Sequence, residues 1–250
     1  MTTALVRRPG PRLPEGLLTH LERTTVDYPK ALDQWEAYVA ALETNGWKVD
    51  HVEPADENPD AVFVEDTVVV FGDLAVITRP GADDRKPEIA GTEVAVGRHL
   101  ADIVHITAPA TLDGGDVLKV GSTVYVGLSQ RTNLAAVDQL ASFLPGRNVK
   151  AVPVTKVLHL KSAMTALPDG TVIGHEPVVD KPSMFEHFLG VPEESGSAVV
   201  DLEGGRLLMS ADCPRSVAIV RARGYHVVTV DISEFQKLEG CVTCLSVRIR

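Results

Sequence analysis

Apolar side chains recur every three or four residues in five segments of the chain, which is the spacing of a helix with one buried face. The segments span residues 30–44, 87–100, 132–144, 183–189 and 214–224. The third presents Leu134, Val137 and Ala141 on one face, and the fifth begins at Pro214 and ends at Gly224. Proline is favoured at the start of a helix and glycine just after its end. The pattern therefore predicts five helices.

Short apolar runs, typical of buried strands, follow each predicted helix. They span residues 47–52, 103–106, 149–154, 198–200 and 225–230. Three hairpins are predicted to turn at Gly72, Gly121 and Gly170, because glycine next to Asp or Ser favours a tight turn. Near the end of the chain, Val247 and Ile249 alternate with polar residues, which predicts a closing strand. The resulting unit is a β-β-α-β repeat that occurs five times.

A polar or glycine-rich stretch follows each predicted strand, and the residues suited to chemistry fall at matching points in these stretches. Asp113 lies 47 residues after Asp66, His159 lies 46 after Asp113, and Cys244 lies 85 after His159, or about two repeats. Repeats placed around an axis would bring these positions together. We therefore expect an α/β protein, a five-bladed α/β propeller whose single domain spans 1–250. An ordinary doubly wound sheet is the alternative.

Composition narrows the possible partners. The formal net charge of −10 argues against a nucleic-acid binder. The sequence has no apolar run long enough for a transmembrane helix and no signal peptide at its start, so we expect no membrane partner. Three cysteines, an odd number, favour a reducing cytoplasm. The acidic surface is compatible with a monomer or a homodimer.

Cys244 has three possible roles. A free cysteine commonly packs as a small apolar residue. The pair Cys241 and Cys244 has the spacing of a redox pair or of half a zinc site. A redox pair usually begins a helix, however, whereas this one precedes a strand, and Cys213 has no close partner to complete a zinc site. The third role is that of a nucleophile.

His159 lies between two leucines, where a histidine ordinarily forms part of the core. It is nevertheless the only histidine in phase with Asp113 and Cys244. A cysteine nucleophile needs a base and later an acid, and histidine can serve as both. Glu65 and Asp66 would point to opposite sides of an extended segment, so one of them should face the centre. A buried cluster of acids suits a cationic ligand.

Six motifs together resemble those of the dimethylarginine dimethylaminohydrolases, which belong to the guanidino-group-modifying pentein superfamily. They span residues 59–66, 78–82, 111–118, 126–133, 158–162 and 240–247. They occur in the order found in that family and cover nearly the whole chain. The family fold is a five-bladed α/β propeller, in agreement with the repeat.

The resemblance implies a role for each matching residue. Cys244 would be the nucleophile, His159 the general acid and base, and Asp113 the acid beside the histidine. Asp66, supported by Glu65, would bind the substrate guanidinium. The remaining positions implied to contact the substrate are Asp60, Arg85 and Arg131 at its amino-acid end, and a leucine in an N-terminal lid, for which Leu18 and Leu21 are both candidates.

The implied reaction is hydrolysis of Nω,Nω-dimethyl-L-arginine, or of the monomethyl compound, to L-citrulline and dimethylamine or methylamine. It would pass through a covalent thiouronium on Cys244, without a metal or an organic cofactor. Arginine deiminase and agmatine deiminase are alternatives, although the former is longer and the substrate of the latter has no carboxylate for Arg85 and Arg131. A non-catalytic propeller and a thiol redox protein are alternatives from other classes.

Overall fold

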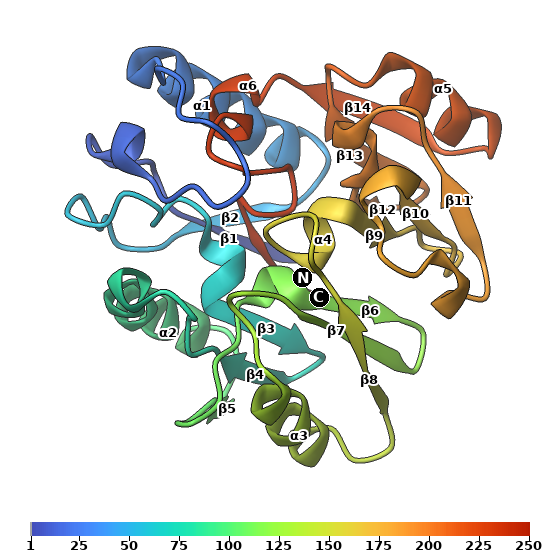
Figure 1. Cartoon of the computed structure of the whole chain (residues 1–250). Helices are drawn as coiled ribbons and strands as arrows, with labels where there is room; N and C mark the ends of the chain where they lie inside the picture. Colours follow the sequence, from blue (N-terminus) through green and yellow to red (C-terminus); the bar gives the residue numbers. More distant parts are fainter. Residues whose placement is uncertain (1) are drawn as a thin grey trace.

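The computed structural model describes residues 2–250, and Met1, the first residue of the expected domain, lies outside the described part. The described residues form five separate three-stranded sheets that follow one another around a ring (Figure 1). In each sheet the strand at one edge is antiparallel to the middle strand, and the other edge strand is parallel to it. This arrangement is the predicted five-bladed α/β propeller, and it is not a doubly wound sheet.

The strands follow the predicted repeat closely. By sheet they are β15 (Val247–Ile249), β1 (Thr3–Val6) and β2 (Lys48–His51); β3 (Val68–Phe71), β4 (Leu74–Ile77) and β5 (Asp102–His105); β6 (Val117–Val120), β7 (Thr123–Leu128) and β8 (Asn148–Pro153); β9 (Met164–Ala166), β10 (Val172–Gly174) and β11 (Phe188–Gly190); and β12 (Val200–Glu203), β13 (Arg206–Ser210) and β14 (His226–Val230). The three predicted hairpins are present. Strand β1 and the β12–β13 hairpin were not predicted.

Four longer helices lie on the outside of the ring (Figure 1). They are α1 (Tyr28–Thr44), α2 (Ile89–Gly97), α3 (Leu134–Phe143) and α5 (Pro214–Ala222). Two single-turn helices, α4 (Leu160–Ala163) and α6 (Ser233–Gln236), lie elsewhere, with 3-10 turns η1 (Leu13–Glu15), η2 (Val64–Thr67), η3 (Asp83–Glu88), η4 (Gly114–Asp116), η5 (Glu176–Val178), η6 (Pro182–Met184) and η7 (Glu194–Ser197). Helix α1 begins where Asp27 accepts a hydrogen bond from the backbone N–H of Lys30.

Two helical predictions were wrong in part. Residues 183–189 form no helix: η6 and strand β11 occupy this segment, because β10 takes Phe188–Gly190 as its parallel partner. Helix α3 is present, but it buries Ala136, Val137 and Leu140, whereas Leu134 is 58% exposed. Asn133 caps this helix, so Leu134 is its first residue and lies at the edge of the buried face.

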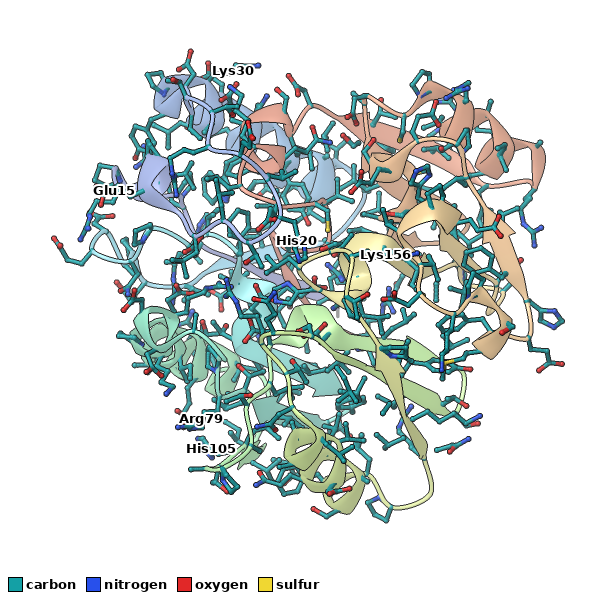
Figure 2. The ribbon with its side chains drawn as sticks, in the orientation of Figure 1. Glu15, His20, Lys30, Arg79, His105 and Lys156 are labelled. Atoms are coloured by element: carbon teal, nitrogen blue, oxygen red, sulfur yellow. The ribbon has the colours of Figure 1, made fainter. Side chains whose placement is uncertain are left out.

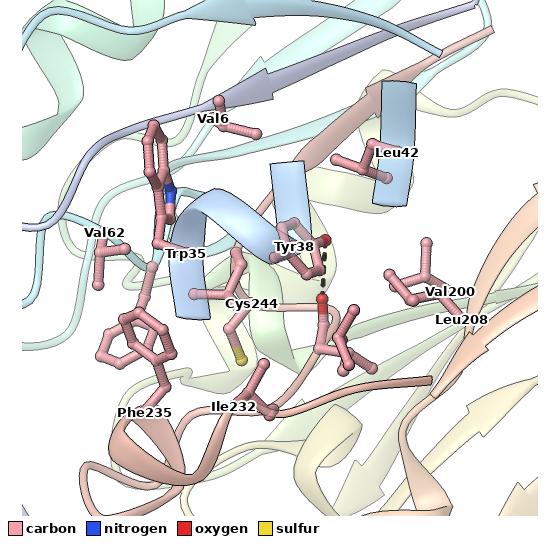
Figure 3. Packing of buried hydrophobic residues seen from close by; sticks show 14 of the residues in the cluster. Val6, Trp35, Tyr38, Leu42, Val62, Val200, Leu208, Ile232, Phe235 and Cys244 are labelled. Atoms are coloured by element: carbon pink, nitrogen blue, oxygen red, sulfur yellow. Dashed lines mark hydrogen bonds between the residues drawn. The ribbon is translucent and has the colours of Figure 1, made fainter. Parts of the chain in front are cut away.

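The two ends of the chain close the ring in one sheet. Strand β15 is antiparallel to β1, with Ile249 opposite Thr3 and Val247 opposite Leu5. The predicted closing strand is therefore confirmed. Helix α1 packs against the turn before β15 in the cluster of Figure 3, where the Tyr38 hydroxyl donates a hydrogen bond to the carbonyl of Val242 at 2.9 Å.

A short turn precedes the first strand of each sheet. These turns are η2, η4, α4, η7 and residues 241–245. They carry the polar stretches singled out in the sequence, and the ring brings several of them into contact. Within the described residues, no helix combines the length and the apolar character needed to cross a bilayer.

Candidate active site

Four predicted residues occupy these central turns. Asp66 belongs to η2, Asp113 and His159 immediately precede η4 and α4, and Cys244 lies three residues before β15. All four side chains are buried. Asp66, His159 and Cys244 line one small cavity, so residues far apart in the sequence share a single site.

Asp113 contacts the Nε2 side of the His159 imidazole. Its Oδ2 lies 3.0 Å from His159 Nε2, and its Oδ1 accepts a hydrogen bond from the backbone N–H of Gly81 at 2.9 Å. Asp113 is fully buried and does not belong to the cavity wall. Its carboxylate therefore fixes the orientation of the imidazole and leaves Nδ1 of His159 free of it.

Asp66 lies on the other side of the imidazole. Its Oδ1 is 3.8 Å from His159 Nδ1 and accepts the N–H of Gly115 at 2.9 Å, and its Oδ2 is 2.6 Å from Arg85 Nη1. A Cβ atom on Gly115 would lie only 2.7 Å from both Asp66 Oδ1 and His159 Nδ1. Glycine is therefore required for these two side chains to approach each other.

The surrounding carboxylates favour the imidazolium form of His159. Burial by itself lowers the pKa of His159, but the charge of Asp66 and the hydrogen bond to Asp113 outweigh it and raise the pKa to about 9. Burial by itself raises the pKa of Asp66, but His159 and Arg85 lower it below its ordinary value. At neutral pH the empty site therefore contains an ionised Asp66 and a protonated His159.

Cys241 and Cys244 both belong to the closing turn, residues 241–245, and their sulfurs lie 3.3 Å apart. The hydrogen bond to Cys241, burial and the charges of Glu65 and Asp66 raise the pKa of Cys244 well above its ordinary value. The same hydrogen bond lowers the pKa of Cys241 to about 7. Cys244 is therefore a thiol in the empty site.

The two predicted arginines line the cavity but differ in their contacts. Arg85 is held by Asp66, by Glu88 at 2.9 Å and by the backbone carbonyls of Asp60 and Phe63. Arg131 approaches Asp113 at 3.7 Å, and its guanidinium makes no hydrogen bond to another described residue. Arg131 is thus the arginine with more donors available for a ligand.

Glu65 faces away from this cavity. Its Oε1 lies 2.7 Å from Lys161 Nζ and 3.3 Å from Arg248 Nη2, and its side chain lines a separate cavity of about 140 Å³ bordered by the first strands of the sheets. The sequence predicted that either Glu65 or Asp66 would face the site, and Asp66 does. Glu65 therefore does not support guanidinium binding through a direct contact in this structure.

The cavity shared by Asp66, His159 and Cys244 is small, and the segment after η1 forms part of its wall. Its volume is about 20 Å³, enough for about one water molecule. Leu17 lines it, and the backbone N–H of Leu17 donates to Asp60 Oδ2 at 3.1 Å. Leu18 packs against the core instead, and Leu21 is 49% exposed. Leu17 is therefore the leucine of this segment that lines the cavity, whereas the predicted candidates Leu18 and Leu21 do not line it.

Glu239 holds the same segment closed, a role that the sequence did not reveal. Its carboxylate accepts the backbone N–H groups of Thr19, His20 and Leu21 at 2.8, 2.6 and 3.2 Å. Glu239 has a φ of 61°, which is unfavourable for a residue with a side chain. Sequence patterns could not pair Glu239 with the lid, because some 220 residues separate them.

A cation could also be held here. Asp66, Asp113 and His159 each place one ligand atom within 4.8 Å of the others. The donor set is buried and carries two carboxylates, which suits a small cation as well as a guanidinium. The hydrogen bonds of Asp113 to His159 and Gly81, and of Asp66 to Arg85 and Gly115, already occupy these oxygens.

Comparison with known proteins places this site in a family. The family model described as arginine deiminase matches residues 51–199. An N(G),N(G)-dimethylarginine dimethylaminohydrolase from Streptomyces coelicolor is 61% identical over 249 residues, which cover 99% of this chain and 96% of that protein. The chain belongs to the dimethylarginine dimethylaminohydrolase family. A member from Pseudomonas aeruginosa is 36% identical over 251 residues, covering 98% of each chain.

Solved structures of dimethylarginine dimethylaminohydrolases share the whole fold. A cysteine-to-serine variant from Pseudomonas aeruginosa, complexed with citrulline, superposes with a TM-score of 0.91 at 33% identity and covers 99% of this chain and 98% of that one. A histidine-to-glycine variant, an adduct with S-methyl-L-thiocitrulline, gives a TM-score of 0.92 at 33% identity with complete coverage of both chains. Both confirm the five-bladed pentein fold.

Proposed function

We propose that this chain hydrolyses Nω,Nω-dimethyl-L-arginine, and the monomethyl compound, to L-citrulline and dimethylamine or methylamine, as one catalytic domain over 1–250. The observation that carries the proposal is that Cys244, His159 and Asp66 line the same buried cavity. Within this one cavity, Cys244 supplies a nucleophile, His159 a proton donor and Asp66 an anion for a cationic guanidinium. The names of the relatives point to the same reaction.

Substrate binding follows from the charges around the cavity. Asp66, ionised and buried, attracts the guanidinium, and Arg131 has donors for the α-carboxylate at the other end. Arg85 positions Asp66 and has one Nη1 hydrogen left for the ligand. Asp60 contributes a carboxylate whose oxygens accept the N–H of Leu17, so it links the substrate pocket to the lid.

Binding prepares the nucleophile. The positive guanidinium offsets the negative field that raises the pKa of Cys244, so the thiol loses its proton to solvent when substrate is present. The sulfur then attacks the central guanidino carbon. His159, which starts as an imidazolium, gives its Nδ1 proton to the dimethylamine nitrogen, because its Nε2 is bound to Asp113. The C–N bond breaks, dimethylamine leaves and a thiouronium remains on Cys244.

Hydrolysis of the thiouronium uses the neutral imidazole left by the first step. His159 accepts a proton from a water molecule, and the resulting hydroxide adds to the same carbon. The C–S bond then breaks, and the added hydroxyl loses its proton to solvent as the C=O bond of citrulline forms. Citrulline is released, and the Cys244 thiolate takes up a proton from solvent to restore the thiol. The lid must open for both substrate entry and product release, because the closed cavity is about 20 Å³.

Citrulline release tests the proposal. The assay compares dimethylarginine, arginine and agmatine, because the matching family model is described as arginine deiminase. We expect turnover of dimethylarginine, none with Cys244→Ser, and most of it retained with Cys241→Ser. Turnover of arginine but not of dimethylarginine would instead assign the deiminase reaction, and activity in Cys244→Ser would remove the nucleophile from the mechanism.

A further inference from the structure

A second cavity adjoins the substrate cavity, and the mechanism does not use it. Its volume is about 630 Å³, and the lid and the turn after α6 contribute to its wall. Figure 2 labels His20 and Lys156, two of its lining residues, near the middle of the ring. Cys241 lines this larger cavity, whereas Cys244 lines the small one. The two thiols of the closing turn therefore face different compartments.

The partition between the compartments is thin. Glu239, Gly240 and Leu158 line both cavities. Cys241 is partly exposed, and Cys244 is buried. The wall of the larger cavity therefore includes the partly exposed Cys241, whereas the buried Cys244 does not belong to it.

The environment of Cys241 favours its reaction. Its sulfur lies 3.2 Å from the Thr243 hydroxyl and 3.3 Å from the Cys244 sulfur. These contacts lower the pKa of Cys241 to about 7, so it has substantial thiolate character at neutral pH. A disulfide bond is about 2.05 Å long, so the two sulfurs must approach by only about 1.2 Å to become bonded. The proposed catalytic steps do not require this second sulfur.

We propose that Cys241 is an oxidation site for hydrogen peroxide and that it forms a reversible disulfide with Cys244. The regulatory consequence rests on the proposed function, because the disulfide would remove the nucleophile. The Cys241 thiolate attacks one peroxide oxygen, the O–O bond breaks, and a sulfenic acid and hydroxide form; the hydroxide takes up a proton to become water. Cys244 then attacks the sulfenic sulfur. The S–S bond forms, and the released hydroxide and the Cys244 proton give a second water.

The two sulfurs lose two electrons in all, and the peroxide gains them as it becomes two molecules of water. The product is an inactive enzyme in which Cys244 is protected from irreversible oxidation. An external dithiol restores both thiols and the activity.

The test treats the full chain with hydrogen peroxide and follows both peptide mass and activity. Trypsin releases residues 238–248 as one peptide that contains both cysteines. We expect this peptide to lose the mass of two hydrogens, and citrulline release to fall and then recover after addition of dithiothreitol. Cys213→Ser is the matched control, because it removes the third, buried cysteine and should behave like the unmodified chain.

Cys241→Ser separates the two thiols. With each variant compared with its own untreated activity, we expect Cys241→Ser to lose activity more slowly than the parent chain, because Cys244 is a buried thiol. We expect that loss to persist after dithiothreitol, with two or three oxygens added to Cys244. Recovery equal to that of the unmodified chain would overturn the proposal. Absence of the two-hydrogen loss from the unmodified chain would overturn it too, and this mass readout is independent of which guanidino compound the enzyme hydrolyses.

Discussion

Gly115 shows that a missing side chain can matter as much as a reactive one. A methyl group there would lie 2.7 Å from both Asp66 Oδ1 and His159 Nδ1, so these two groups would have to separate. Gly115→Ala should therefore lower kcat/KM for dimethylarginine about 100-fold, the cost of misplacing a catalytic group by about 1 Å.

The matched control for this substitution is Gly97→Ala. Gly97 ends helix α2, and the nearest atom to an added Cβ is 3.7 Å away. Steady-state kinetics should show nearly unchanged activity for it. Equal activity in Gly115→Ala and Gly97→Ala would contradict the tight packing of Asp66 against His159.

The charge on His159 predicts a pH dependence of catalysis. Its pKa of about 9 means that kcat/KM should fall as the pH rises above about 9, because neutral imidazole cannot protonate the leaving amine. Asp113→Asn removes one carboxylate that raises this pKa, so the fall should move to lower pH. An unchanged profile in Asp113→Asn would show that Asp113 does not act on His159.

The same pKa has a consequence for stability. Folding raises the pKa of His159 from 6.5 to about 9, so the folded state holds this proton more tightly than the unfolded state. The resulting stabilisation is complete below about pH 6.5 and is lost as the pH rises through 9. Denaturant titrations should show a smaller loss over this range for Asp113→Asn.

The sequence predicted which residue types form the site better than it predicted the directions of their side chains. A nucleophilic thiol, a histidine and acids in one phase of the repeat identified Cys244, His159 and Asp66, which the structure brings to one cavity. Alternation in an extended segment required one of Glu65 and Asp66 to face the site, but it could not say which. That choice depends on Lys161 and Arg248, which come from other repeats and hold Glu65 on the opposite side.

Among the elements, the lid is the one whose position depends on a distant part of the chain. Glu239 accepts three consecutive backbone N–H groups from it. Hydrogen bonds to a charged group contribute about 1.5–3 kcal/mol each. In Glu239→Ala, amide hydrogen exchange at Thr19, His20 and Leu21 should therefore accelerate at least tenfold.

Glu22→Ala is the control for the lid experiment, because Glu22 is an exposed acid of the same segment. Its effect on exchange at the three amides should be small. If Glu239→Ala and Glu22→Ala exchanged at the same rate, the lid would be held closed by contacts other than Glu239.

Sequence periodicity predicted elements well where the repeat is regular and failed in the fourth sheet. There η5 and η6 connect β10 to β11 in place of a long helix. Phe185 and Phe188 have the spacing of a helical face, but they pack beside each other with ring centroids 6.3 Å apart. Pairing of β11 with β10 therefore determines the structure of this segment, in spite of its local helical pattern.

At the scale of the whole molecule, the chain ends hold the ring together through β1 and β15. Ile249 is 6% exposed and packs in the core between the first two sheets. Ile249→Ala should lower the free energy of unfolding by about 2–5 kcal/mol. Val94→Ala, at a position that is 63% exposed, should change it little. Equal denaturation midpoints for the two variants would show that the closing strand contributes little to stability.

The ring itself could be predicted because its repeat length is nearly constant, with candidate residues 47 and 46 residues apart. Strand β1 could not, because it belongs to the same repeat as β15, from which nearly the whole chain separates it. The cavities likewise depend on side chains from several sheets, and sequence spacing does not determine their volumes.

The most direct test of the proposed function is the mass of the Cys244 peptide after reaction with dimethylarginine. His159→Gly lacks the group that protonates the leaving amine and later activates water. The intermediate should therefore form more slowly but accumulate, because its hydrolysis is nearly abolished, and an acid quench should preserve it. The 238–248 peptide should then carry the mass of dimethylarginine less dimethylamine, located on Cys244 by fragmentation, and the adduct should vanish when Cys244→Ser is added. An adduct on Cys241, or citrulline release at the full rate without any adduct, would contradict covalent catalysis by Cys244.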